Sequence, residues 1–517
     1  MKIGARLRYL RTAITGRTPD GRGGSWSRFA GAVQNRIVQN WFAWLEDPNR
    51  ELVGTLADLR ARAREAVRDN GEAAGLLLDF EADIVGAIGA QLQYRARRPR
   101  GAEITTLNDR VERAWWEWCR PGMCTVGASM SFAALQRLLI RTVITDGEFL
   151  ARKVIDPRLP HGFALQPIDP DQLDETENRG AYGDTKAVVL GIEVDGTGKP
   201  TRYAIWDRHP SLSGRTKQWI PANEIVHAFK RVRVGQLRGI PWFAPALVTW
   251  KLGSRYTEAE LYQSLLAAAQ GGFFVNKDGT AASPEPPKDA NGKAIPLELE
   301  VIPGMGRQLP NGLEWQAWEP KHPTANYVGF MKAIKRTVAR AFGRSYASVT
   351  GDLSDVNFSS MRIDREREKA QNRMHQQDIL IEQFCDVVFA DWFAMAALTG
   401  ALGVVTQAAR DVAYATTWLC TGWPWIDPVK DATAALMELN MGVTSPQRIC
   451  AEKQRDFYGI VDEIAEARAY CLLKGVPMEA VPLAITVQTG ADSDTPSDKN
   501  ATDSTGGRVL PMLKGAA

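Results

Sequence analysis

The amino-acid sequence predicts an α+β fold, in which helical segments flank a region of β-strands. Before residue 147, apolar residues recur mainly at three- and four-residue steps, which is typical of amphipathic helices. From Gly147 the apolar residues alternate, and Gly, Pro and Asp turns separate the segments, as in an antiparallel sheet. The helical period returns at Phe243 and dominates the rest of the chain.

Length and composition describe a globular protein of several domains. The chain has 517 residues, of which 44% are hydrophobic and 24% charged, so disorder is expected only locally. The formal net charge is +3, so the chain as a whole is not strongly basic. Any contact with DNA therefore has to come from local clusters of charge or from many copies acting together.

The cysteines and the N-terminus indicate a reducing compartment. Six cysteines are scattered along a chain without a cleavable apolar leader, so we expect free thiols and no disulfides. Cys119 and Cys124 have no second pair and no nearby histidine, so we expect no metal there. The uncharged segment from Trp392 to Ala409 contains glycines and polar residues, and we interpret it as a buried helix followed by a turn rather than a membrane span.

Helices are expected throughout the first part of the chain. In the helix that starts at Gly71, Leu76, Phe80, Ile84 and Ile88 share one face. The expected helices run over 35–44, 56–67, 71 to a basic end at Arg95, Arg97 and Arg98, 110–119 and 131–144. The strands that follow include a hairpin at Asp195-Gly196. His227 lies on one strand without a nucleophile or an acid nearby in the sequence, so we interpret it as a packed histidine.

Two long helices with a small β-rich segment between them follow the strands. The first runs over 243–270 and stops at Gly271-Gly272. The segment over 273–318 is rich in Pro and Gly, with a strand over 297–302 and a hairpin around Asn311-Gly312. Later helices are expected over 429–439, 445–453 and 460–473, and the polar tail after Gln488 is expected to be disordered.

The second of these helices carries cations at regular spacing. Between Tyr327 and Gly351 there is no acidic residue. The basic residues are Lys332, Arg336, Arg340 and Arg344 at four-residue steps, with Lys335 beside them. Such spacing places them on one side of a helix. This cationic side is either an ordinary solvated surface or a binding surface for an anionic partner.

A polar loop and another helix come next. Asp352, Ser354, Asp355 and Asn357 are turn formers, and Asn357 or Ser359 is suited to cap the helix that follows. That helix begins with alternating charges and becomes apolar after Ile379. Asp352 and Asp355 are also candidate metal ligands, although two carboxylates in a turn are more often caps.

Catalytic motifs are scarce. The GTGKPT segment at Gly196 lacks the pattern of a phosphate-binding loop, and the sequence contains no GxSxG, HExxH or paired-cysteine zinc pattern. The five histidines are isolated from one another. We therefore expect a protein that is not an enzyme, with no cofactor, no catalytic residue and no metal. The alternative is a metal-dependent nuclease, or another DNA-processing enzyme, that uses Asp352 and Asp355.

Five segments, taken in order, resemble the lambda-type portal proteins of tailed bacteriophages. They are 68–89, 220–247, 299–312, 341–362 and 427–457. Each consists mainly of turn and core residues, so it is their order over roughly residues 67–475 that carries the resemblance. The amino end before Asp69 does not take part in it.

The resemblance implies a ring-forming portal fold with an α/β wing, long stem helices, a small β-containing clip and a helical crown. The implied divisions are an arm and wing (1–238), first stem helix (239–271), clip (272–323), second stem helix (324–344), tunnel loop (345–360), long helix and remaining wing (361–420), crown (421–480) and disordered tail (481–517). Such a ring, commonly a dodecamer, replaces one capsid vertex and is the channel for packaging and ejection of double-stranded DNA.

The resemblance also implies partners and a DNA-facing site. The expected channel residues are Lys332, Lys335, Arg336, Arg340, Arg344, Asp352, Ser354, Asn357 and Arg362. The implied partners are further copies of the chain, the major capsid protein and scaffold, the large terminase subunit, the head-tail connector and DNA of any sequence, without a membrane. The expected location is the portal vertex of the virion, and the host cytoplasm during assembly. Alternatively, the stem cations form salt bridges with acids of a neighbouring subunit.

Overall fold

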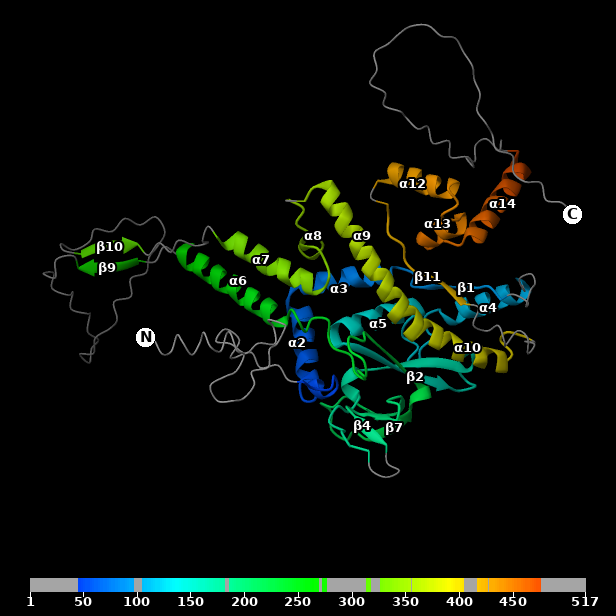
Figure 1. The fold of residues 1–517 in the computed structure, drawn as a ribbon, viewed down its shortest axis with the longest axis horizontal. Coiled ribbons are helices and arrows are strands. Elements are labelled where there is room, and N and C mark those ends of the chain that lie inside the picture. The colour runs from blue at the N-terminus through cyan, green and yellow to red at the C-terminus, as the bar shows by residue number, and fades with distance from the viewer. Residues whose placement is uncertain are drawn as a thin grey trace, which may run out of the picture. The chain divides into compact units, whose positions relative to one another are not determined.

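The computed structural model describes residues 45–96, 105–181, 186–268, 272–276, 313–317, 326–354, 356–403, 416–425 and 427–475. The chain divides into two compact units, Met1–Thr421 and Gly422–Ala517, which are treated separately below. The second unit begins one residue after the expected start of the crown. The first unit combines helices with antiparallel sheets, which is the α+β fold that the sequence predicts (Figure 1).

A three-stranded antiparallel sheet lies at the centre of the first unit. Its order is β3-β2-β8, with β2 (Glu148–Ile155) between β3 (Phe163–Ile168) and β8 (Ile225–Phe229). Leu150 is opposite Ile168 on one side and His227 on the other. Most residues in the first half of β2 are fully buried, because helices cover this sheet.

The remaining strands of this region form a second sheet, where the sequence led us to expect a single one. Its strands are β4 (Ala187–Val189), β5 (Ile192–Val194), β6 (Pro200–Trp206) and β7 (Lys217–Pro221), in that order. The hairpin predicted at Asp195 joins β5 to β6, and the Asp195 carboxylate accepts hydrogen bonds from the backbone N–H groups of Thr197 and Lys199. A separate small apolar core lies under this sheet.

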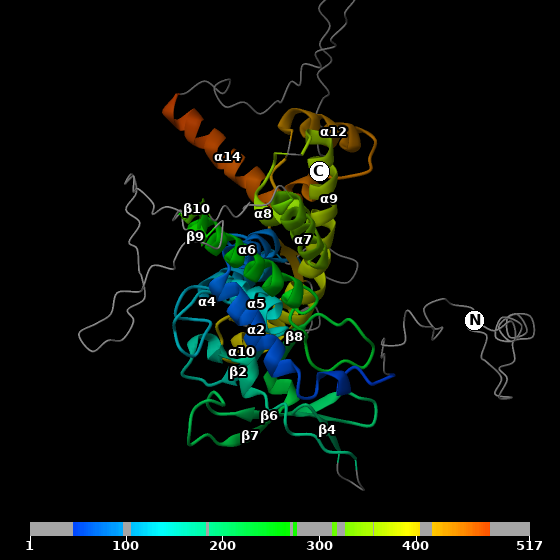
Figure 2. The same cartoon turned by 90° about the vertical axis from the view of Figure 1, so that its left-hand side faces the viewer.

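Helices pack around the central sheet. They are α2 (Leu56–Asp69), α3 (Gly71–Ile84), α4 (Thr105–Trp118) and α5 (Phe132–Asp146), and α5 packs against β2 (Figure 2). Asn70 caps α3 by accepting hydrogen bonds from the backbone N–H groups of Glu72 and Ala73. Because α3 ends at Ile84, Ile88 is not on its apolar face as we expected, and its side chain is exposed. The predicted helix over 35–44 lies outside the described residues.

A cluster of aromatic side chains joins the early and late parts of the first unit. Trp115 of α4 packs edge-on against Phe132 and Trp392. Strand β1 (Gln91–Tyr94), expected to be helical, pairs instead with β11 (Thr416–Leu419). The core of this unit therefore depends on contacts between residues about 300 positions apart in the sequence.

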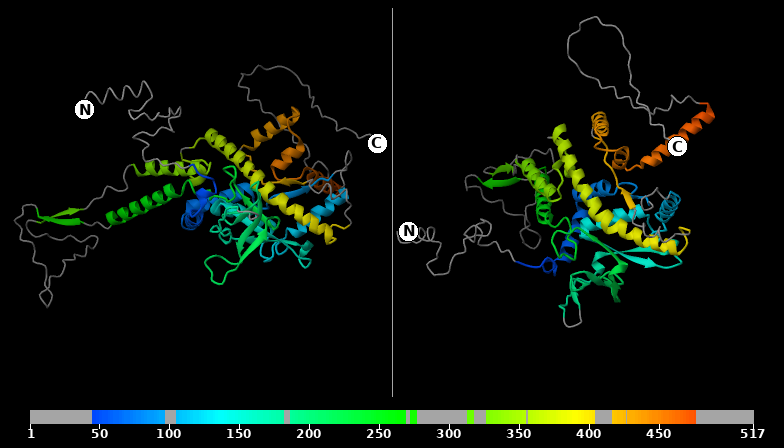
Figure 3. Two further views of the ribbon diagram at one scale, coloured as in Figure 1. Left: turned by 60° about the horizontal axis from the view of Figure 1, so that its bottom comes forward. Right: turned by 45° about the vertical axis from the view of Figure 1, so that its right-hand side comes forward.

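One long helical segment, seen in Figure 3, begins with mainly exposed or half-buried residues and continues into this core. It consists of α9 (Phe358–His375), a π-helical stretch η6 (Gln376–Cys385) and α10 (Asp386–Leu398). Buried residues such as Ile379, Phe384 and Trp392 begin where the sequence predicts the change to apolar character. The segment from Trp392 starts as a buried helix followed by a turn, as expected, and 404–409 lie outside the described residues.

Two helices correspond to the long helices of the sequence prediction. They are α6 (Leu247–Ala268) and α7 (Tyr327–Ala341), which pack against each other (Figure 1). Between them in the sequence, β9 (Gly272–Asn276) pairs with β10 (Leu313–Ala317) in a two-stranded antiparallel sheet, and the hairpin turn expected at Asn311-Gly312 lies outside the described residues. The strand expected over 297–302 lies outside the described residues.

The second unit is helical, as the sequence predicts. It contains α12 (Pro428–Asn440), α13 (Pro446–Glu452) and α14 (Phe457–Lys474), and α13 packs against α14. Asp427, Ser445 and Asp456 cap the three helices in turn. The tail over 481–517 lies outside the described residues. None of the helices in the described ranges is long and apolar enough to cross a bilayer.

Candidate nucleic-acid interface

The inner face of α7 is fixed by aromatic and small-residue contacts with α6. The rings of Tyr256 and Tyr327 stack with their centroids 5.7 Å apart. Gly253 allows close approach, since a Cβ atom at this position would lie 3.2 Å from the Ile334 side chain. Because this face is packed, the predicted cations must lie on the remaining sides of α7, and the structure places each of them differently.

Two cations of α7 share one aromatic ring. The Lys332 Nζ lies 5.4 Å and the Arg336 guanidinium carbon 5.8 Å from the centroid of the Tyr346 ring. Both distances are within the range of a cation–π contact. Arg340 is exposed, and no described residue forms an ion pair or a side-chain hydrogen bond with it. Of these three cations, Arg336 and Arg340 are exposed and Lys332 is half-buried.

Lys335 belongs to a different environment. It forms an ion pair with Glu72 in the first turn of α3, within the same chain. Both side chains are about one-third exposed, so the pair contributes little stability but does reduce the positive charge that Lys335 presents. Lys335 also lines a surface cavity of about 550 Å³ between α6, α7 and the start of α3.

The structure does not support Arg344 as a DNA-contacting residue, because its side chain is only 3% exposed. Its guanidinium donates to Asp83 at 2.7 Å and to Asn372 at 3.2 Å, and lies 4.1 Å from the centre of the Phe80 ring. Helix α7 ends at Ala341, so the four-residue steps do not continue to Arg344 on the same surface. Its charge is neutralised inside the subunit rather than by DNA or a neighbouring stem.

The loop predicted over 345–360 contains a short helix, α8 (Tyr346–Thr350), which corrects that expectation. Ser345 caps α8, and its own backbone N–H donates to the buried Glu368 of α9 at 2.9 Å. The Ser348 hydroxyl donates to the same carboxylate at 2.8 Å. The start of α8 is therefore anchored to α9.

Asp352 forms a turn with the residues beside it. One carboxylate oxygen accepts hydrogen bonds from the backbone N–H and the hydroxyl of Ser354, at 3.0 and 2.6 Å. The other oxygen accepts a hydrogen bond from the Tyr346 hydroxyl at 3.2 Å. The Ser354 hydroxyl bond lowers the pKa of Asp352. Asp352 therefore stabilises a turn, as an aspartate in a loop commonly does. Asp355, the second candidate metal ligand, lies outside the described residues.

Asn357 and Arg362 lie at the start of α9. The Asn357 side chain caps the helix by accepting a hydrogen bond from the Ser360 backbone N–H at 2.8 Å, as the sequence predicts. Asn357 and Ser354 are exposed, and Arg362 is half-buried. Of the expected channel residues, the structure thus brings Lys332, Arg336 and Asp352 together around Tyr346, a residue that the sequence analysis did not single out.

A second feature that the sequence analysis missed is an exposed apolar surface on α6. Leu252 and Leu261 are 60% and 61% exposed. The large exposed apolar residues of α6 are Val248, Leu252, Leu261, Tyr262 and Leu265. The steps from Val248 to Leu252 and from Leu261 to Leu265 are helical steps of four, so the members of each pair lie on the same side of α6, and the two pairs lie on different sides of the helix. A surface of this kind is typical of a contact with another protein or another copy.

Possible metal ligands occur elsewhere. Within the described ranges, one group of three lies close together, namely Asp169, Asp171 and His209. Asp171 is already bound by Arg60 at 2.7 Å and by Arg64 at 2.6 Å. These guanidinium groups neutralise the carboxylate, so the arrangement is that of an ion-pair network.

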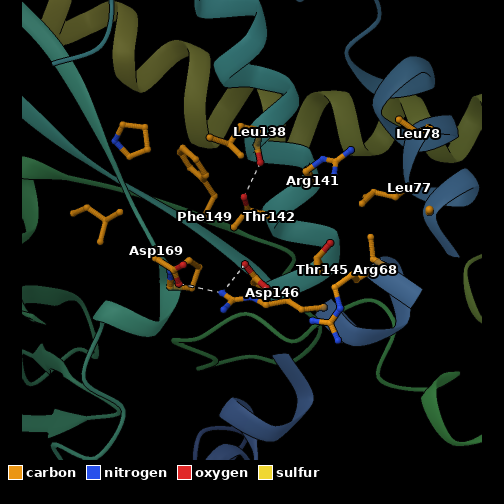
Figure 4. Close-up of a pocket in the computed structure, with 16 residues that line it drawn as sticks. Arg68, Leu77, Leu78, Leu138, Arg141, Thr142, Thr145, Asp146, Phe149 and Asp169 are labelled. Carbon is orange, nitrogen blue, oxygen red and sulfur yellow. Dashed lines mark hydrogen bonds and ion pairs between the residues drawn. The ribbon is translucent and has the colours of Figure 1, made fainter. Parts of the chain in front are cut away.

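The same network borders a groove of about 670 Å³ between α2, α3 and α5 (Figure 4). Leu77, Leu138 and Phe149 line it together with three arginines. Each arginine is held by a carboxylate: Arg64 by Asp146, Arg68 by Asp69 and Arg141 by Glu81. None of the predicted channel residues lies in this groove.

Comparison with known families identifies the class of protein. The family model described as "Phage portal protein, lambda family" matches residues 34–376, which is more than half of the chain. The chain therefore belongs to the lambda family of phage portal proteins. This is the family that the five ordered segments resemble, and the match extends into the region before Asp69.

Individual portal proteins match over most of their length. The probable portal protein of Halomonas phage phiHAP-1 is 30% identical over 448 residues, which cover 85% of each chain. The portal protein of Escherichia phage N15 is 22% identical over 84% of this chain and 88% of its own. Portal protein B of Escherichia phage lambda is 21% identical, with the same coverage.

Solved structures with a similar fold come from gene transfer agent particles. The neck of an empty particle matches 82% of this chain and 94% of its own, with 17% identity and a TM-score of 0.42. The neck of a native particle matches 77% of this chain and 94% of its own, with 16% identity and a TM-score of 0.42.

Proposed function

We propose that this portal protein works as one subunit of a homo-oligomeric ring of about twelve copies at one vertex of a phage or prophage capsid. Double-stranded DNA would pass through the ring during packaging and ejection. The observation that carries the proposal is the α6–α7 pair, which combines a large exposed apolar surface on α6 with accessible cations on α7. A subunit that must contact both its neighbours and DNA needs both features.

The apolar surface of α6 supports the ring. Leu252, Leu261 and Leu265 expose 60–66% of their surface in the isolated subunit. Large exposed apolar side chains gathered on one helix are typical of an oligomer interface. A ring requires two different complementary surfaces on each subunit. We propose that the apolar surface of α6 is one of them and that it packs against the stem helices of the neighbouring subunit.

The cations of α7 support contact with DNA. Lys332, Arg336 and Arg340 carry positive charge on a helix without acidic residues, so ring symmetry would repeat that charge around the channel. Contact with phosphate oxygens does not depend on base sequence, as sliding DNA requires. The modest net charge of +3 per chain is compatible with this role because the cations are concentrated locally.

The division of the chain follows from the same proposal. Residues 1–238 would form the arm and wing, 239–271 and 324–344 the stem, and 272–323 the clip. The tunnel loop would span 345–360, with α8 inside it, 361–420 would complete the wing, and 421–480 would form the crown. The clip would bind the large terminase subunit during packaging and the head-tail connector afterwards, while the wing would contact the major capsid protein and scaffold.

The family is structural rather than enzymatic. Both oxygens of Asp352 accept hydrogen bonds from the same chain, so no observation on the described residues favours the nuclease alternative. Assay of the purified protein for cleavage of DNA that depends on divalent metal tests that alternative directly. Loss of such cleavage in a variant with Asp352→Ala and Asp355→Ala would establish it.

The mass and shape of the purified protein test the ring. Each chain has a mass of 57.0 kDa, and light scattering should give about twelve times this value for the particle. Negative-stain images should show a ring with a central hole. A protein that remains monomeric even when it is co-expressed with its capsid proteins would contradict the proposal.

A further inference from the structure

Tyr346 connects three parts of the proposed channel site. Its ring faces Lys332 and Arg336 of α7, and its hydroxyl donates a hydrogen bond to Asp352 in the loop that follows α8. The two cations are one helical turn apart, so both reach the same ring from one side of α7. A single side chain thus contacts both the stem cations and the loop.

The position of Tyr346 is itself fixed by α9. Glu368 is only 2% exposed and accepts hydrogen bonds from the Ser345 backbone N–H and from the Ser348 hydroxyl, on either side of Tyr346. Glu368 also lies 3.6 Å from the buried Arg344. The first turn of α8 is therefore held in place, whereas the ring of Tyr346 is partly exposed beside the cations.

The contacts of Tyr346 restrict the side chains that make them. Lysine and arginine side chains have many rotamers, and a cation that rests on an aromatic face occupies fewer of them. The loop turn at Asp352 is held by three hydrogen bonds, two from Ser354 and one from Tyr346. The bond from Tyr346 is the one that ties the Asp352 carboxylate to α8, while the backbone N–H of Asp352 donates a longer bond, of 3.3 Å, to the Thr350 hydroxyl at the end of that helix.

We propose that Tyr346 is a positioning residue that holds Lys332 and Arg336 beside the loop at Asp352 until DNA phosphates draw the two cations away. This inference rests on the proposed function, because it assumes that these cations meet DNA. A phosphate competes with the aromatic face for the same positive charge. When the cations leave, Tyr346 loses two contacts and the turn at Asp352 loosens.

The coupling between DNA binding and the contact of Tyr346 with Asp352 must be reciprocal. If DNA weakens the contact between Tyr346 and Asp352, then loss of that contact changes the affinity of the cations for DNA by the same factor. The effect on the loop can be measured at the Ser354 amide, whose N–H donates to Asp352 and is protected from hydrogen exchange only while the turn is formed.

Three variants of the full-length ring separate the contacts. Tyr346→Leu removes the aromatic face and the hydroxyl, whereas Tyr346→Phe removes only the hydroxyl. Arg340→Gln is the matched control, because it removes a cation of the same helix that does not touch Tyr346. The probe is a mixed-sequence DNA duplex of about 30 base pairs. Two quantities are measured for each ring: the rate of hydrogen exchange at the Ser354 amide, and the affinity for the duplex as a function of salt concentration.

In the unmodified ring, the duplex should speed exchange at Ser354 several-fold. In the Tyr346→Leu ring, exchange should already be fast without DNA and should not respond to the duplex. The Tyr346→Phe ring should show faster exchange but keep the salt dependence of the unmodified ring. Arg340→Gln should reduce the salt dependence and leave the response of Ser354 to DNA unchanged.

Two results would overturn the proposal in different ways. If Ser354 exchanges at the same rate in the Tyr346→Leu and unmodified rings, Tyr346 does not hold the loop. If a Lys332→Gln and Arg336→Gln ring binds the duplex with unchanged salt dependence, these cations do not meet DNA, and the assignment of the channel residues fails with it. The ring itself would remain established by its mass and shape.

Discussion

Arg238 and Glu148 form a fully buried, bidentate ion pair shortly before α6. The Arg238 Nε and Nη2 atoms lie 2.8 and 2.5 Å from one Glu148 oxygen, and neither side chain is exposed. Glu148 also accepts hydrogen bonds from the backbone N–H of Gly239 and from His227, both at 3.0 Å. Because Glu148 begins β2 and Arg238 precedes α6, this pair connects the central sheet to the segment that leads into α6.

We expect Glu148→Gln to destabilise the subunit strongly. Breaking a buried ion pair leaves Arg238 charged and without its partner, which costs about 3–5 kcal/mol in comparable cases. Urea unfolding followed by tryptophan fluorescence measures the loss. The control is Glu65→Gln, since the pair of Glu65 with Lys251 is about half exposed and water screens it, so its loss should change stability little. Equal losses for the two variants would show that the buried pair does not stabilise the fold more than an exposed pair does.

His375 should make stability depend on pH. It packs against Trp242 with ring centroids 4.6 Å apart, and burial, together with Lys230 and Arg344, lowers the pKa of His375 to about 3. The unfolded chain binds a proton near pH 6.5, where folded His375 stays neutral. Its stabilising contribution is therefore complete above pH 6.5 and decreases as the pH falls toward 3, by at most about 1.4 kcal/mol per pH unit.

His375→Gln should flatten this part of the stability profile. The difference between the two proteins is measured by urea unfolding between pH 6.5 and 5, above the range in which carboxylates gain protons. His227, whose pKa burial also lowers, is present in both proteins and cancels in the comparison. Parallel profiles for the two proteins would mean that His375 is protonated in the folded state.

Leu261→Glu should prevent ring formation without unfolding the subunit. Leu261 is 61% exposed on α6. A charged side chain there should therefore change the free energy of unfolding of the monomer by no more than about 0.5 kcal/mol. In the ring, the same carboxylate would be buried in the proposed interface without a partner. The control is Leu212→Glu, because Leu212 is 55% exposed in the loop between β6 and β7. Rings that assemble normally with Leu261→Glu would place the interface elsewhere.

The sequence predicts the elements of this fold better than their partners. Periodicity and turn residues are local, so the helices, the strands and the cap at Asn357 follow from nearby residues. The pairing of β1 with β11 is different, because residues about 300 positions apart form it. The division of the strands into two sheets is likewise decided by packing that no single segment encodes.

Arg344 shows why the candidate site was only partly predictable. Its four-residue step from Arg340 is a property of the sequence, but its burial depends on Asp83, Asn372 and Phe80, which lie on two other helices. Tyr346 was overlooked for the same reason, since its role arises from side chains on α7 and in the loop. Spacing identified the cations, and only the tertiary contacts separate the accessible cations from the buried one.

Arg336→Glu combined with Arg340→Glu should impair DNA packaging and retention while rings still assemble. Both side chains are exposed on α7, so their reversal should leave folding intact but replace phosphate attraction by repulsion in every subunit. We expect at least about a tenfold loss of packaged DNA, measured as DNA protected in purified particles, with ring assembly checked by light scattering. The matched control is Arg62→Glu on α2, whose side chain is 65% exposed. If the double variant fails to form rings, these arginines bind a neighbouring subunit instead of DNA.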